Sequence, residues 1–369
     1  MAYTTIKDPS AYFQIKKYAG TSGLNIPVTH TNDGNSDLQP DFIWFKETGS
    51  PGGYNYEHYL VDSSRGRAKG LHCDNTAAET TTAATTNDLV SFDSDGFKVG
   101  APSEGNSTNG GNTNKVAWQW KCNGGTTASN TDGDINSTVQ VNQTAGFSIV
   151  TYTGNGSTSD QTIGHGLGVR ANAVIVKNRD AAVNWVVWSE GVDANHTLEL
   201  NTTDGISDST QGRVLSNAGS RGTSTIFSIR SGGGSVVQTN TNNQNYIAYC
   251  FASKQGYSKF GKYKGNSNDN GTFVYLGFKP RWLMIKSTQA NMSWDIMDTV
   301  RSTTNPMDDY FTANTSDPQG TSSTKNIDFL SNGFKCRDDN NINFSDHTYI
   351  YMAFAEHPFV AGGVPTTAR

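Results

Sequence analysis

The chain has 369 residues, a length that predicts two or three domains at about 100 to 200 residues each. Only 34% of the residues are apolar and 17% are charged, against about 45–50% and 25% in an average globular chain, but 17 Phe, 15 Tyr and 7 Trp can build several small cores. The net charge is −5 and no Lys/Arg run is long enough to follow a phosphate backbone, which argues against nucleic acid as a partner.

The sequence also argues against membrane and cofactor chemistry. No stretch approaches 18 consecutive apolar residues, and residues 1–20 lack the pattern of a secretory signal, so we expect synthesis in a cytoplasm and no membrane insertion. The four cysteines are far apart and have no histidine at ligand spacing, which favours reduced thiols over a disulfide or a zinc site. They are Cys73, Cys122, Cys250 and Cys336. We therefore expect no cofactor.

Short strand-like segments recur three times along the chain in the same order. A segment ending in Tyr-x-Gly begins each copy, at residues 12–20, 147–154 and 257–265. An apolar run closed by lysine follows, at residues 40–46, 171–177 and 280–286. The third segment stands at residues 58–62, 185–189 and 294–298. In the first and third copies an aspartate and an arginine follow each other at the same spacing, Asp62/Arg65 and Asp298/Arg301, and we interpret them as turn-closing or sheet-edge ion pairs.

Two further segments complete the repeat. Residues 94–99 (SDGFKV) match residues 331–336 (SNGFKC), whereas the middle copy has the alternating segment 225–230 instead. The last segment stands at residues 116–121, 247–252 and 351–356. The second and last segments shift together by 131 residues between the first two copies, which indicates duplication of one unit.

These segments predict an all-β protein. Each is short, rich in β-branched and aromatic residues and bounded by turn residues, and the Asp95-Gly96 and Asn332-Gly333 pairs predict tight hairpins. Runs that are apolar throughout predict strands covered on both faces. We expect three tandem antiparallel β-sandwich domains, jelly-roll or lectin-like: unit 1 at residues 1–122, unit 2 at residues 145–254 and unit 3 at residues 255–369 with a C-terminal tail. A polar linker is expected at residues 123–144.

The segments MAYTTIKDPSAYFQ, DGNSDLQPDFIWFK, SFDSDGFKVG, KVAWQWK, GFSIVTYTGNGST and GHGLG resemble a family of marine bacteriophage virion proteins, especially those of cyanophages. The resemblance spans essentially the whole chain and is weaker in unit 3. It implies a virion structural protein, tail-fibre-like or decoration-like, and it carries over no catalytic motif. It also implies a location in the virion, at the tail or on the capsid exterior.

One cluster of residues suggests ligand binding. Tyr54, Tyr56, His58 and Tyr59 crowd beside two glycines in unit 1, and exposed flat rings with polar rims suit sugar faces. Half-buried cross-strand aromatics explain the same residues, and that interpretation is favoured.

Metal and catalytic sites are weaker candidates. Asp93 and Asp95, like Asp132 and Asp134, resemble fragments of a calcium loop but lack the later glutamate, so turns are favoured. His165 lies in a glycine-rich segment without a nucleophile signature. No carboxylate pair that would serve a glycosidase can be identified, and we expect no enzymatic activity.

The function expected is therefore that of a tail fibre or tail-associated adhesin for host attachment and particle assembly. A capsid decoration or connector protein and a virion-associated glycan-degrading enzyme are the alternatives. The expected partners are other virion proteins and a host cell-surface glycan or protein, and we expect a homo-oligomer.

Overall fold

The computed structural model describes residues 4–21, 27–49, 56–81, 88–100, 108–110, 113–193, 196–208, 222–229, 238–361 and 364–365. The all-β prediction is confirmed, with several antiparallel sheets and a single-turn 3-10 helix, η1 (Pro9–Ala11), before the first strand. Across these ranges, no helix is long and apolar enough to cross a membrane.

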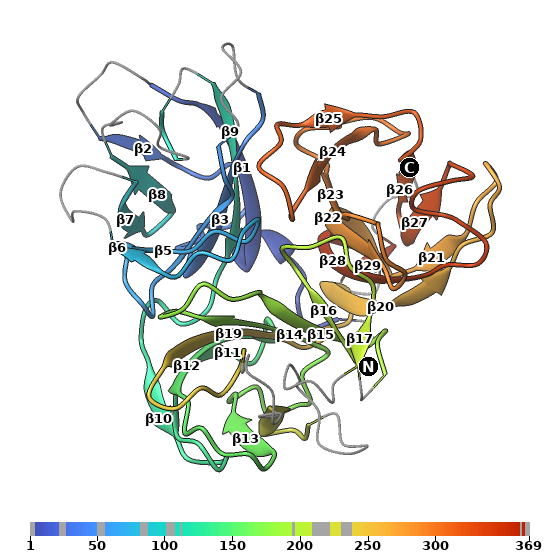
Figure 1. Ribbon diagram of the computed structural model, residues 1–369. Helices are drawn as coiled ribbons and strands as arrows, with labels where there is room; N and C mark the ends of the chain where they lie inside the picture. Colours follow the sequence, from blue (N-terminus) through green and yellow to red (C-terminus); the bar gives the residue numbers. More distant parts are fainter. Residues whose placement is uncertain are drawn as a thin grey trace.

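The strands form three groups, drawn in blue, green and orange in Figure 1. In unit 1 the main sheet has the order β1 (Phe13–Ala19), β9 (Asn114–Trp120), β3 (Phe42–Glu47), β4 (Tyr59–Asp62). A smaller outer sheet has the order β2 (Val28–His30), β8 (Gly96–Val99), β7 (Leu89–Asp93). The short pair β5 (Lys69–Gly70) and β6 (Thr80–Thr81) lies beside them.

Unit 2 has a wider main sheet. Its order is β10 (Ala128–Asn130), β11 (Ser137–Asn142), β12 (Phe147–Thr153), β19 (Asn245–Phe251), β14 (Ala173–Asn178), β15 (Val186–Ser189), β16 (His196–Glu199), β17 (Ser207–Asp208). The outer sheet pairs β13 (Gln161–Gly164) with β18 (Ile226–Ile229). The divergent segment of the middle copy thus supplies an outer strand.

Unit 3 repeats the arrangement of unit 1. Its main sheet has the order β20 (Ser258–Lys264), β28 (Thr348–Pro358), β22 (Phe278–Ser287), β23 (Trp294–Asp298), β24 (Asp309–Thr312), β25 (Gly320–Thr321). The outer sheet has the order β21 (Phe273–Tyr275), β27 (Gly333–Cys336), β26 (Ile327–Leu330). The pair β29 (Val360–Ala361) and β30 (Val364–Pro365) follows. The hairpins expected at residues 94–96 and 331–333 are present.

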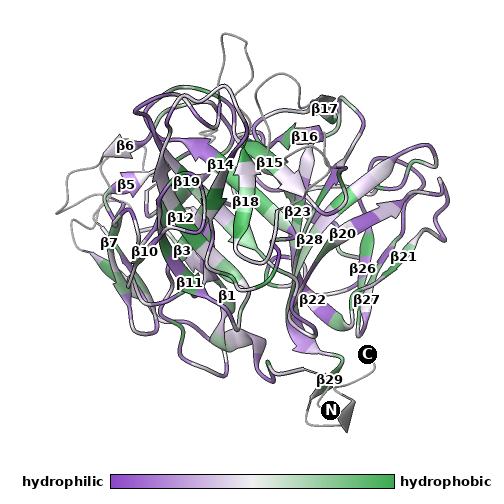
Figure 2. Ribbon diagram, turned by 90° about the horizontal axis from the view of Figure 1, so that it is seen from below, coloured by the Kyte–Doolittle hydropathy of each residue, from purple (hydrophilic) through white to green (hydrophobic). Residues whose placement is uncertain are grey.

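Both faces are covered in the central part of each main sheet, which explains the continuous apolar runs. Side chains alternate between the two faces of a strand. In β12, Phe147 and Ile149 join one central cluster, whereas Val150 and Tyr152 pack under the outer sheet of unit 2. Units 1 and 3 have corresponding outer clusters. Figure 2 shows hydrophobic residues along the strands of all three groups.

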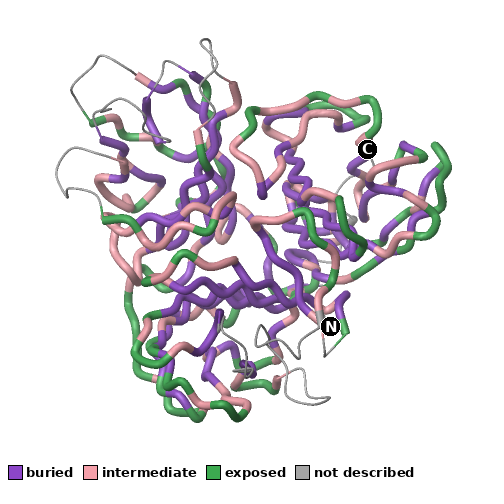
Figure 3. Tube along the Cα trace, in the orientation of Figure 1, coloured by how far each residue is buried: buried purple, intermediate pink, exposed green. Residues whose placement is uncertain are grey.

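The central cluster is shared by all three units, so the units are not independent domains. Phe42 of unit 1 stacks on Tyr249 of unit 2 with ring centroids 4.4 Å apart, and Trp120 of unit 1 meets Trp282 of unit 3 at 5.8 Å. The void that remains among these rings is about 10 Å³, no more than one water molecule needs. Figure 3 shows the buried chain concentrated where the three groups meet.

The predicted linker at residues 123–144 is wrong, because most of it is part of the unit 2 sheet. Strand β11 pairs with β12, and its Val139 lies under the outer sheet. The preceding turn is anchored to unit 1 by the Asp41 carboxylate, which accepts hydrogen bonds from the backbone N–H groups of Cys122 (2.6 Å), Gly124 (3.0 Å) and Gly125 (2.8 Å). We count residues 123–144 in unit 2 from here on.

Three buried lysines, Lys46, Lys177 and Lys286, connect the units in a ring, and we call them the lysine staples. They close the apolar runs found in the sequence and have no exposed surface. Each Nζ donates to carbonyl oxygens of its own unit and to one of another unit. The acceptors in the other unit are Ser316 for Lys46 (2.8 Å), Thr76 for Lys177 (3.0 Å) and Thr203 for Lys286 (3.0 Å). Unit 1 thus bonds to unit 3, unit 2 to unit 1, and unit 3 to unit 2.

The two repeated ion pairs close turns, as predicted, and they also lie at unit boundaries. Arg65 Nε donates to Asp62 and Arg301 Nε to Asp298, each at 2.6 Å, with all four side chains fully buried. Asp62 accepts from the Tyr249 hydroxyl of unit 2 (2.8 Å). Their burial was not expected, because charged side chains are mostly exposed.

Candidate functional site

The aromatic cluster of unit 1 is not an exposed binding surface in its described part. Tyr54 lies outside the described residues, and Tyr56 is half-buried with the Lys115 ammonium 4.8 Å from its ring centroid. His58 and Tyr59 are buried. The favoured interpretation, packing between strands, therefore holds for these two side chains, and neither offers a ring face to a ligand.

His58 is held as a neutral imidazole. Its Nδ1 accepts a hydrogen bond from Trp44 Nε1 (2.8 Å), which leaves Nε2 to donate to the Thr312 carbonyl of unit 3 (3.1 Å). Burial lowers the pKa of His58 well below its usual value. His165 has the same arrangement, accepting from the Leu167 backbone N–H at Nδ1. Both histidines are structural.

Of the four aspartates proposed as weak calcium ligands, Asp93 is the last residue of β7, and the other three lie in turns or bends. Asp93 accepts from the Ser91 hydroxyl (2.6 Å) and Asp95 from the Leu38 backbone N–H (3.2 Å). Asp132 accepts from the Asn130 side chain (3.0 Å), and Asp134 accepts from both the backbone and the hydroxyl of Thr162 (3.0 and 2.8 Å). The described residues contain no group of three or more His, Cys, Asp or Glu placed to hold a metal ion. The four cysteines are buried and unpaired, as predicted.

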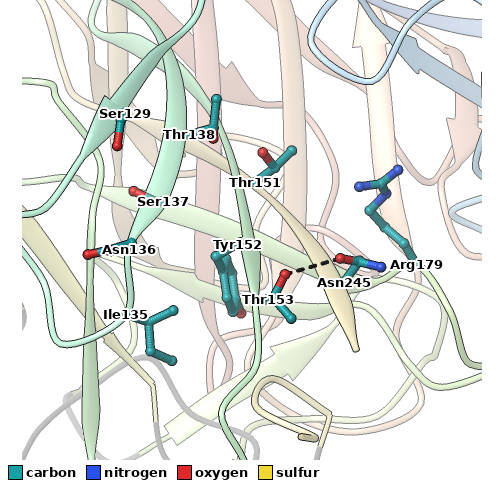
Figure 4. A pocket seen from close by; sticks show the side chains of 10 residues that line it. All are labelled: Ser129, Ile135, Asn136, Ser137, Thr138, Thr151, Tyr152, Thr153, Arg179 and Asn245. Atoms are coloured by element: carbon teal, nitrogen blue, oxygen red, sulfur yellow. Dashed lines mark hydrogen bonds between the residues drawn. The ribbon is translucent and has the colours of Figure 1, made fainter. Parts of the chain in front are cut away.

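An open polar groove lies on the main sheet of unit 2, with a volume of about 430 Å³. We call it the unit 2 groove. It is lined mainly by hydroxyl and amide side chains, with one guanidinium (Figure 4). These polar lining residues are Ser129, Asn136, Ser137, Thr138, Thr151, Tyr152, Thr153, Arg179 and Asn245.

The groove exists because the unit 2 sheet extends beyond the central core. On the core-facing side of β12, Phe147 and Ile149 are covered by the other units, whereas Thr151 and Thr153 lie beyond the covered region. Thr138 of β11 stands opposite Thr151, and Thr153 opposite Asn245 of β19, whose Oδ1 accepts from its hydroxyl (3.2 Å). The hydroxyl groups are thus displayed on a paired, rigid sheet surface.

Arg179, at one end of the groove, is held by unit 1. Its Nε and Nη2 donate to the two oxygens of Glu79 at 2.7 and 2.9 Å, and Glu79 also accepts from Arg65 (2.9 Å). Burial alone would raise the pKa of Glu79, but the hydrogen bonds from Arg179 and the charge of Arg65 lower it. Because Glu79 neutralises the guanidinium, the groove is polar but carries little net charge.

The sequence interpretation missed this groove because it treated residues 123–144 as a linker. The alternation of Ile135, Val139 and Val141 with polar neighbours is a strand signal that could have identified β11. The contribution of Arg179 had no comparable signal, because its partner Glu79 is 100 residues away in sequence.

A second group of ionisable side chains lies near the Lys46 staple. His72 Nδ1 is 3.1 Å from Glu57, and one oxygen of Asp74 is buried without a hydrogen-bond partner among the described residues. Burial, with a further contribution from the charge of Glu57, raises the pKa of Asp74 to about 7. The folded protein therefore retains a proton between pH 4 and 7 that the unfolded chain releases, so this group lowers stability as the pH rises through that range.

We expect Asp74→Asn to stabilise the protein at pH 8 by about 2 kcal/mol, because the amide imitates the protonated carboxyl at no charge cost. The gain should shrink as the pH falls to 4, where the wild-type group is protonated. Urea unfolding at both pH values measures it. Asp346→Asn, at a side chain that is 84% exposed, is the control and should show no pH-dependent gain. An equal gain in stability at pH 4 and pH 8 would contradict the raised pKa of Asp74.

Comparison with known proteins identifies one family. The model of a domain of unknown function, DUF7483, matches residues 8–358. No curated protein matches the chain. No solved structure matches it either. The family model covers the three groups of sheets, the lysine staples and the unit 2 groove, and the chain belongs to the DUF7483 family.

Proposed function

We propose that the protein is a non-enzymatic structural and attachment protein of a bacteriophage particle, a tail fibre or tail-associated adhesin, and that the unit 2 groove contacts a polar, uncharged host-surface glycan. The observation that carries the proposal is the groove itself. Hydroxyls and amides held on a paired sheet can exchange hydrogen bonds with sugar hydroxyls without reorganising. The resemblance of the sequence to marine phage virion proteins supports the location.

The roles of the buried reactive groups support a binding function over catalysis. Asp41 holds the turn before β10, and Asp62 and Asp298 hold arginines. His58 and His165 are locked in hydrogen bonds to the backbone. A glycosidase needs two carboxyl groups facing one open site, whereas the unit 2 groove is lined by hydroxyls, amides and one neutralised arginine.

We expect Thr151→Tyr to weaken binding of the full chain to host envelope polysaccharide by about tenfold or more, because the added ring fills the groove and displaces hydrogen bonds worth about 1.4 kcal/mol. Binding is measured by surface plasmon resonance on immobilised envelope polysaccharide. Thr158→Tyr, at an exposed position that does not line the groove, is the matched control and should bind as the wild type does. Equal binding by both variants would remove the groove from the proposal.

Two further measurements separate the alternatives. Immunogold labelling of whole particles should place the protein on the tail, whereas labelling of the head surface would favour a capsid decoration protein. Release of reducing sugar from host polysaccharide, abolished by a single Asp or Glu substitution, would replace the proposal with a glycan-degrading enzyme.

A further inference from the structure

The outer sheet of unit 3 displays two aromatic rings to solvent. In β21, Phe273 is 44% exposed and Tyr275 is 49% exposed, while Val274 between them is buried. The two rings lie on one face of the strand because side chains alternate. Figures 1 and 2 both place β21 at the outer rim of the molecule. We call this pair of rings the unit 3 platform.

The folding of the repeat does not require these rings. In unit 1 the equivalent cross-strand pair is Thr29 opposite Lys98, whereas in unit 3 it is Phe273 opposite Lys335. The same three-stranded outer sheet thus forms with a threonine at the ring position. An aromatic side chain left about half exposed gains less from folding than a buried one, and two such rings on one face of a strand offer an apolar surface to a ligand.

The charge around the platform is positive. Lys259 Nζ lies 5.5 Å from the centroid of the Tyr275 ring, and Lys335 stands directly across from Phe273. Asp328 of β26 stands opposite Lys335, but its carboxylate pairs with Arg337 at 2.5 Å. The two lysines and the arginine therefore leave an excess of positive charge around the rings, although the whole chain carries a net charge of −5. Lys335 Nζ donates to the Asn270 side chain (2.5 Å), which adds an amide to the rim.

Strand β21 is an edge strand, and a lysine side chain bonds to its backbone, which argues against addition of a partner strand. Lys259 Nζ donates to the backbone carbonyl of Tyr275 at 2.7 Å, and a lysine placed on an edge strand discourages pairing with another chain. A ligand is therefore expected to lie across the ring faces. Two ammonium groups are too few to hold a nucleic acid, which is bound through several phosphates.

We propose that the unit 3 platform binds an acidic polysaccharide, with sugar rings stacked on Phe273 and Tyr275 and carboxylates paired with Lys259 and Lys335. Sugar rings present C–H faces that pack on aromatic rings, and the two ammonium groups select for negative charge. This site does not depend on the unit 2 groove, so its ligand is a second one.

The test measures binding of the full chain to polygalacturonate, to neutral dextran and to a single-stranded oligonucleotide. We expect wild-type protein to bind polygalacturonate in a salt-sensitive way and to bind the other two much more weakly. Phe273→Ala combined with Tyr275→Ala should lower affinity for polygalacturonate about tenfold, because both stacking surfaces are lost. Lys335→Gln should lower the affinity by less than the double variant does, and its effect should be larger at low salt than at high salt.

Val169→Ala, at another exposed apolar side chain (43%) in unit 2, is the control and should bind as the wild type does. Equal affinity for dextran, tighter binding of the oligonucleotide, or unchanged binding by the double variant would each overturn the proposal. Thr151→Tyr should leave polygalacturonate binding intact. If this variant still binds polygalacturonate but the wild-type chain does not attach to host envelopes, the proposed attachment function is contradicted, whereas the binding site on the unit 3 platform is supported.

Discussion

Asp298→Asn is expected to lower the free energy of unfolding by about 3–5 kcal/mol, because it leaves the charged Arg301 buried without a counter-charge. Asp298 also accepts from Trp118 Nε1 of unit 1 (3.1 Å) and from the backbone N–H groups of Val300 and Arg301. The guanidinium packs 4.2 Å from the Phe311 ring centroid, away from water. Urea unfolding at pH 7 measures the loss.

The corresponding ion pair in unit 1, between Asp62 and Arg65, provides a comparison within the same protein. Arg65 also bonds to a second carboxylate, Glu79, at 2.9 Å, so Asp62→Asn leaves the guanidinium partly compensated. We expect a loss of about 1–3 kcal/mol there. Asp328→Asn, beside an arginine side chain that is 42% exposed, should cost less than about 1 kcal/mol. Equal losses for Asp298→Asn and Asp62→Asn would contradict the role assigned to Glu79.

Lys177→Met is expected to destabilise the protein by about 2–4 kcal/mol. Lys177 Nζ donates to three carbonyl oxygens, those of Thr76 (3.0 Å), Ala181 (3.2 Å) and Val183 (2.8 Å). Each carbonyl left unsatisfied costs about 1–3 kcal/mol. Burial lowers the pKa of Lys177 to about 8, so removing the ammonium recovers about 3 kcal/mol at neutral pH. The lost hydrogen bonds outweigh that gain.

Because Thr76 belongs to unit 1, the loss should also appear as faster amide hydrogen exchange around residues 70–81, and not only within unit 2. Lys262→Met, at an exposed lysine, is the control for the change of residue type and should leave both stability and exchange unchanged. A stable Lys177→Met variant with normal exchange would mean that the staple contributes nothing to holding the units together.

The sequence predicted the strands well because their signals are local. Runs such as Phe42 to Phe45 are apolar at every position, which indicates cover on both faces. The second face of each main sheet is covered by the other units, through contacts between residues more than 100 positions apart, such as Phe42 and Tyr249. No local sequence pattern encodes such contacts. The expectation of separate domains therefore missed the shared centre.

The candidate sites were harder to predict for a related reason. In the sequence, Tyr56, His58 and Tyr59 resemble a ligand-binding surface. In the structure, unit 3 covers His58, whose Nε2 donates a hydrogen bond to the Thr312 carbonyl. Conversely, Thr138 and Thr151 look like ordinary strand residues, and only the width of the unit 2 sheet leaves them open to solvent. Exposure is decided by tertiary packing, which composition and periodicity report poorly.

The ring of lysine staples has a consequence for how the molecule can vary. The staples run from unit 1 to unit 3, from unit 3 to unit 2 and from unit 2 to unit 1, and so they close into a ring. Within this ring the units are not identical: among the described residues, only unit 2 extends its main sheet with two strands, β10 and β11, before its opening strand β12. If both proposed sites bind saccharide, the connected units would hold two unlike ligands on one molecule, so that capture of the first would raise the effective concentration of the second.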